Sequence, residues 1–113
     1  MENWQQRTDL LLGADGVASL AASRVLVVGV GGVGAYAAEA LVRAGVGHIT
    51  IIDGDNVSTT NINRQLPALH STVGQSKVEV VKSRLLDINP ELEIEARQEF
   101  VTVESVPELL SDG

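Results

Sequence analysis

Residues 24–34 read RVLVVGVGGVG, and this stretch decides the fold. The apolar run over 24–30 does not alternate with polar residues, which is typical of a strand buried on both faces of a parallel sheet. The glycines that follow lead into an alanine-rich helix predicted over 35–44, and a second strand is predicted over 48–53. Strand, glycine turn, helix and strand form a βαβ unit, so we expect an α/β, Rossmann-like fold.

The rest of the chain surrounds this unit with helices, one long loop and a further strand. In chain order these are helices over 4–12 and 17–22, a polar loop over 55–69 with one helical turn, an amphipathic helix over 73–89, an exposed strand over 92–97 and a helix over 103–111. A doubly wound sheet needs further strands beside the first. We therefore expect an N-terminal helical segment over 1–23. Residues 24–113 should form the front half of a larger doubly wound nucleotide-binding domain, and the alternative is a small domain that is complete with three strands.

Composition excludes several classes of protein. A chain of 113 residues with 44% apolar residues folds as one domain, and its net charge of −7 argues against binding nucleic acid by bulk electrostatics alone. It has no cysteine, which excludes a disulfide scaffold and a cysteine nucleophile within these residues. Apolar runs are too short for a membrane span, and the polar N-terminus is not a signal peptide. These features predict a soluble cytoplasmic protein.

The glycine-rich segment has the pattern G-x-G-x-x-G directly after the predicted strand. Gly29 permits the tight turn, Gly31 lets a phosphate approach the backbone, and Gly34 lets the helix pack closely on the strand. The start of the helix then offers free N–H groups and the positive end of its dipole to an anion. The motif predicts nucleotide binding, with a ligand-free glycine turn as the alternative. The candidate binding residues in this turn are Gly29, Gly31, Gly32 and Gly34.

Two acidic residues follow the second predicted strand. Asp53 comes nineteen residues after Gly34, where a carboxylate can accept both ribose hydroxyls of an adenosine. The alternative is that Asp53 only caps the turn behind the strand. Asp55 is either a further binding residue or a cap of the loop.

Two basic residues suggest which nucleotide is bound. A glycine turn already holds the pyrophosphate of a dinucleotide, whereas a triphosphate carries more charge and needs cations such as Arg64 and Lys77. Polar donors on the same loop are Thr60, Asn61, Asn63 and Gln65. The alternatives are that Arg64 is a solvated loop charge and that Lys77 is an exposed helix residue paired with an acid such as Glu79.

Five segments together resemble one protein family: RVLVVGVGGVG over 24–34, DGDNV over 53–57, TNINRQ over 60–65, VGQSK over 73–77 and INP over 88–90. This is the ThiF/MoeB/HesA family of ubiquitin-activating-enzyme-like adenylating proteins. The opening RTDLLLG at 7–13 and the form of 60–65 are most similar to the subgroup that dehydrates threonylcarbamoyladenosine in tRNA to its cyclic form.

The resemblance implies a role for each candidate residue. The glycine turn and Asp53 hold ATP, and Asn61, Arg64 and Lys77 match the positions that contact its phosphates. Asp55 and Gln65 are further candidate residues of the nucleotide site. Arg7 reaches into the neighbouring site of a homodimer, so that Arg64, Lys77 and Arg7 act in catalysis. A substrate carboxylate attacks the α-phosphate to form an acyl-adenylate, and Mg²⁺ is held by an aspartate beyond residue 113.

The resemblance also implies partners, and other functions remain open. A tRNA would bind mostly through residues after 113, a sulfur-transfer partner is possible, and residues 1–113 alone should be inactive. The alternatives are adenylation of the C-terminal glycine of a ubiquitin-like sulfur carrier, an NAD-binding oxidoreductase, and a non-catalytic nucleotide-binding module.

Overall fold

The computed structural model describes residues 4–101, except for the side chains of Arg7 and Asp9. Its sheet consists of β1 (Arg24–Val28), β2 (His48–Ile52) and β3 (Glu93–Arg97), all parallel and in the order β1-β2-β3. The carboxyl ends of the strands therefore meet at one edge of the sheet. The βαβ unit and the parallel sheet predicted from the sequence are confirmed.

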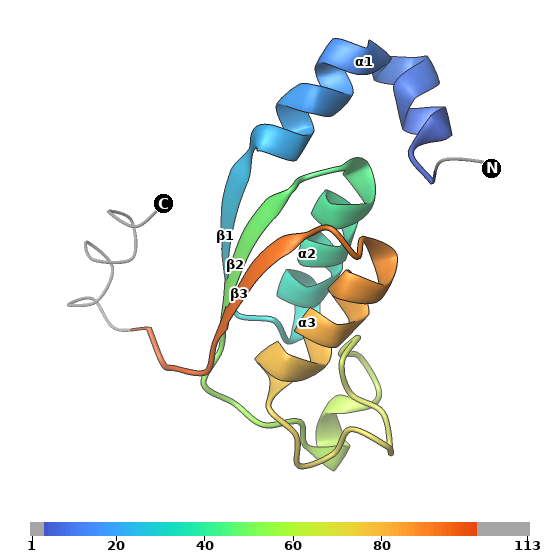
Figure 1. The fold of residues 1–113 in the computed structure, drawn as a ribbon. Coiled ribbons are helices and arrows are strands. Elements are labelled where there is room, and N and C mark those ends of the chain that lie inside the picture. The colour runs from blue at the N-terminus through green and yellow to red at the C-terminus, as the bar shows by residue number, and fades with distance from the viewer. Residues whose placement is uncertain (1–3, 102–113) are drawn as a thin grey trace.

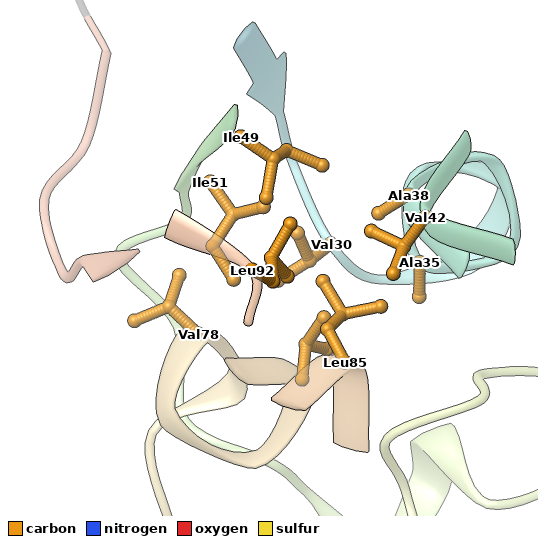
Figure 2. Packing of buried hydrophobic residues seen from close by; sticks show 10 residues of the cluster. Val30, Ala35, Ala38, Val42, Ile49, Ile51, Val78, Leu85 and Leu92 are labelled. Carbon is orange, nitrogen blue, oxygen red and sulfur yellow. The ribbon is translucent and has the colours of Figure 1, made fainter. Parts of the chain in front are cut away.

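Two helices, α2 (Gly32–Ala44) and α3 (Lys77–Ile88), cover the same face of the sheet (Figure 1). Small and branched side chains fill the space between helices and sheet, as expected from an aromatic content of only 3%. The buried cluster, most of which Figure 2 labels, consists of Val30, Ala35, Ala38, Val42, Ile49, Ile51, Val78, Val81, Leu85 and Leu92. Alanines on α2 let this helix approach the strands closely.

β1 is less buried than predicted. Among the described strands it pairs only with β2, and Val28 at its end is 53% exposed. The prediction of a strand buried on both faces is therefore wrong for residues 4–101. The helices α2 and α3 cover one face of the sheet, and no described strand pairs with the outer edge of β1. The strand also ends at Val28, before the glycine turn rather than within it.

The predicted helices before β1 form one element, α1 (Gln6–Ala22), which is broken at Gly13. Gly13 has φ 77° and ψ 167°, so the chain leaves the helix there and re-enters it. The break at this glycine is confirmed. Among the described helices, none combines the length and apolar character that crossing a membrane requires.

The segment between β2 and α3 is shaped by pairing between its two ends. It contains the predicted helical turn as the 3-10 helix η1 (Thr59–Asn61). The predicted helix start at 73 is wrong, because α3 begins at Lys77. Residues 74 and 75 instead form hydrogen bonds with Val57. The Gly74 N–H donates to the Val57 carbonyl at 2.9 Å, and the Val57 N–H donates to the Gln75 carbonyl at 2.7 Å. The helix predicted over 103–111 lies outside the described residues.

An ion-pair cluster joins α2 to α3. The Glu39 carboxylate accepts hydrogen bonds from Arg43 on its own helix and from Arg84 on α3, at 2.9 to 3.1 Å. The hydrogen bond from Arg84 does most to lower the pKa of Glu39 below its usual value, Arg43 adds to this, and burial opposes it. The cluster fixes the two helices next to each other above the core.

Candidate nucleotide-binding site

The glycine turn follows β1 at the carboxyl edge of the sheet. Gly29 has φ 84° and Gly32 has φ 47°, a region that side chains rarely adopt, so both positions require glycine. A Cβ on Gly34 would collide with the Gly29 carbonyl oxygen, so the helix could not start this close to the turn with any other residue. Within the turn, the Gly34 N–H donates to the Gly31 carbonyl at 3.1 Å, and the start of α2 offers the positive end of its dipole to an anion.

Asp53 connects the glycine turn to the loop after β2. Its Oδ2 accepts the Val30 N–H and its Oδ1 accepts the Asp55 N–H, both at 2.9 Å. The capping role considered as an alternative is therefore confirmed. Each carboxylate oxygen has a second lone pair, so these bonds fix the carboxylate while leaving acceptor capacity for ribose hydroxyls.

Lys77 is buried, in contrast to the alternative of an exposed helix residue. Its side chain is only 7% exposed, and its Nζ lies 3.9 Å from Oδ2 of Asp55, not beside Glu79. Its backbone N–H donates to the Asp55 carbonyl at 3.1 Å. Hydrogen bonds thus run from the glycine turn through Asp53 and Asp55 to the first residue of α3. A nearly buried ammonium close to a single exposed carboxylate is suited to bind a further anion.

The loop residues Asn61 and Arg64 are held within their own segment. Oδ1 of Asn61 accepts the Ser58 N–H at 3.0 Å and closes η1. The exposed Arg64 guanidinium donates to the Thr60 carbonyl and to Oδ1 of Asn63. Among residues 4–101, Arg64 is not paired with an acid, which agrees with the alternative of a solvated loop charge and leaves its exposed guanidinium accessible to a ligand.

Gln65 lies against the glycine turn. Its side-chain amide is the group that a Cβ on Gly31 would meet, with Oε1 2.6 Å and Cδ 2.9 Å from that position. Oε1 is buried and has no hydrogen-bond partner within the described part of the chain. Arg7 lies in α1, and its side chain is outside the described residues.

Two further residues at this edge were not predicted from the sequence. Ser76, directly before Lys77, has a buried hydroxyl without a partner among the described residues. The Phe100 ring lies against Gly54, where an added Cβ would come within 2.6 Å of its Cγ, yet Phe100 is 71% exposed. Two sequence features could have identified them: Ser76 lies at the start of a helix, and Phe100, the only phenylalanine of the chain, lies just after a strand.

The arrangement fits a nucleoside triphosphate better than a bound metal alone. The backbone of the glycine turn is suited to a phosphate, and the carboxylate of Asp53 is suited to the ribose hydroxyls. The buried ammonium of Lys77 is suited to a further phosphate. Within residues 4–101, no three His, Cys, Asp or Glu side chains gather in a way that could hold a metal ion.

Comparison with known proteins points to the same chemistry. The ThiF family model matches residues 5–112. The tRNA threonylcarbamoyladenosine dehydratase of Bacillus subtilis (strain 168) is 51% identical over 107 residues, covering 95% of this chain and 42% of that protein. The crystal structure of the E. coli enzyme TcdA in complex with ATP has a TM-score of 0.92 at 44% identity, covering 100% of this chain and 48% of that one.

A second enzyme class is also related. The molybdopterin-synthase adenylyltransferase of Escherichia coli (strain K12) is 48% identical over 80 residues, covering 71% of this chain and 32% of that protein. The chain therefore spans less than half the length of these relatives.

Proposed function

Because the chain belongs to the ThiF family, we propose that it provides ATP-binding residues of an enzyme that adenylates a carboxylate. The observation that carries this proposal is the buried ammonium of Lys77, only 7% exposed, near a fixed strand-end carboxylate. A dinucleotide has no use for this extra cation, whereas a triphosphate does. The identity to tRNA threonylcarbamoyladenosine dehydratases supports the threonyl carboxylate of that tRNA nucleoside as the group activated.

The reaction has two balanced steps. A carboxylate oxygen attacks the α-phosphorus of ATP, the bond to the bridging oxygen breaks, and pyrophosphate leaves. In the resulting acyl-adenylate, the carbamoyl group attacks the activated carbonyl, loses a proton and expels AMP. The oxygen that is lost from the substrate, formally as water, leaves on AMP.

Each candidate residue has a distinct part in this scheme. The glycine turn and Asp53 hold the nucleotide, while Asn61, Arg64 and Lys77 contact its phosphates. Arg64 and Lys77 stabilise the charge that builds up on the departing pyrophosphate, so they matter more in the transition state than in the ground state.

Further components come from outside the described site. We expect Mg²⁺ to be needed for turnover, with ligands other than residues 4–101, and tRNA to bind mainly elsewhere in the full-length protein. We expect a homodimer in which Arg7 completes the partner's site, and a cytoplasmic location together with its tRNA substrate. A sulfur-transfer partner is a further candidate to be tested by co-purification.

The decisive experiment incubates the full-length protein with ATP, Mg²⁺ and tRNA that carries threonylcarbamoyladenosine. Nucleoside mass spectrometry should show the mass of one water lost and AMP formed in equal amount. Conversion without ATP, or ATP binding no tighter than NAD binding, would contradict the proposal. Mixing Arg7→Ala with Lys77→Met subunits should restore activity if the site is shared, since one of the two mixed sites is then intact.

The second candidate is adenylation of a ubiquitin-like sulfur carrier at its C-terminal glycine. The identity to molybdopterin-synthase adenylyltransferase favours it as the alternative. ATP–pyrophosphate exchange that depends on such a carrier, and not on tRNA, would establish it in place of the dehydratase activity.

A further inference from the structure

We propose that Gln65 is a positioning residue of the glycine turn, so that the loop after β2 holds the turn in its phosphate-binding shape. The inference rests on the proposed function for its ATP readout, and on the structure alone for its contact. Gln65 and Gly31 are far apart in sequence, yet the side-chain amide of one lies on the α-carbon of the other.

Position 31 requires glycine because of the neighbouring Gln65 side chain, not because of its backbone conformation. Gly31 has φ −90° and ψ 172°, a conformation that any residue adopts, so its backbone does not require glycine. Gly29 and Gly32 need glycine for their positive φ, and Gly34 for its approach to a carbonyl. At Gly31, the atoms nearest to an added Cβ all belong to the Gln65 side chain. A protein group thus occupies the side of Gly31 that the sequence motif assigned to phosphate.

The end of the Gln65 side chain is buried against the turn. Its Oε1 has no hydrogen-bond partner among residues 4–101, so the contact with Gly31 depends on packing and not on a hydrogen bond. The amide also sits on the loop that carries Asn61 and Arg64, so this single contact joins the two segments proposed to meet the phosphates.

The test is a double-mutant cycle in the full-length protein. Oε1 is the end of a flexible side chain, so Gly31→Ala should displace the Gln65 amide instead of disrupting the turn. Gly31→Ala and Gln65→Ala therefore remove the same contact. Each should weaken ATP binding by about twofold to 150-fold, which corresponds to the coupling energies of neighbouring residues, and the double variant by no more than the larger single effect. Single effects that multiply, or that are absent, would overturn the proposal.

Two further arms separate positioning from a general loss of structure. Adenosine binding, measured by competition with a fluorescent ATP analogue, should be unchanged in Gln65→Ala, because only the phosphate-facing turn is affected. Gln65→Met keeps a chain of similar length over Gly31 and should recover most of the ATP affinity. Equal losses for ATP and adenosine, or equal losses in the Met and Ala variants, would contradict positioning by contact.

The control is Gln75→Ala, in the same loop, where the exposed side chain donates to the Ser71 carbonyl. It should bind ATP like the wild type. If the wild type itself does not bind ATP, the proposed function fails. In that case thermal unfolding of the same four proteins without nucleotide still decides the inference, since additive stability changes would exclude the contact.

Discussion

Replacing Lys77 by methionine tests the proposed site most directly. Its Nζ is 3.9 Å from Asp55, a carboxylate that is 59% exposed, and at this distance water-like screening leaves only about 1 kcal/mol of attraction. The ion pair therefore offsets little of the cost of burying the ammonium. Lys77→Met keeps the length and apolar contacts of the side chain, so we expect unfolding free energy to change by no more than about 1 kcal/mol.

ATP binding should respond very differently. A charge-assisted hydrogen bond from Lys77 to a phosphate oxygen contributes about 1.5–3 kcal/mol, which corresponds to a rise in Kd of roughly tenfold to a hundredfold. Isothermal titration of the full-length protein with ATP measures this, and chemical denaturation of the same samples measures stability. Lys82→Met, at the other lysine of α3, is the matched control and should leave Kd unchanged.

The opposite pattern would refute the reasoning. If Lys77→Met bound ATP within about threefold of wild type, the interaction lost would be below about 0.7 kcal/mol, too small for a phosphate contact. Lys77 would then be a structural residue of the helix start.

Three other changes give distinct outcomes. Asp53→Asn should weaken ATP binding at least about tenfold, since the amide cannot accept at both positions, and unchanged affinity in a titration would remove Asp53 from the site. Gly34→Ala should prevent cooperative unfolding from being observed by circular dichroism, because its Cβ would collide with the Gly29 carbonyl oxygen. Glu39 has a lowered pKa, so its ionised form stabilises the fold above the ordinary glutamate range and this contribution is lost as pH falls through the folded pKa. Glu39→Gln should therefore be less stable at pH 7, by about 1 kcal/mol or less, with a difference that shrinks below about pH 4 in denaturation curves.

The local parts of the fold could be predicted from sequence because their causes are local. The unbroken apolar run before Gly29 predicts β1, and the residues around Gly13 predict a helix break that occurs at that glycine. The stripe of Val78, Val81 and Leu85 predicts the buried face of α3. Each of these depends on residues within a few positions of one another.

The parts that could not be predicted depend on distant partners. The start of α3 is set by pairing of 74–75 with Val57, which no helical pattern reveals. The sequence marks Lys77 as a candidate phosphate-binding cation, with an exposed helix residue as the alternative, but its burial follows from tertiary packing that the sequence pattern does not reveal. The contact between Gln65 and Gly31 likewise requires the loop to fold back on the turn. For Asp53 the sequence offered capping or ligand binding, and the structure allows both at once.

The two outer strands of the sheet differ in their ability to accept a neighbour. β1 presents a run of aliphatic side chains, RVLVV, and an unpaired backbone edge within the described residues. β3 has exposed charges at Glu93 and Glu95, which discourage edge-to-edge association. Residues 1–113 expressed by themselves should therefore aggregate through β1. A lysine in place of Val28, which is 53% exposed, should lower the light scattering of such samples, whereas the same change at Glu95 should not. A further strand can thus be added to the sheet at the edge of β1, whereas the exposed glutamates of β3 discourage strand addition at the other edge.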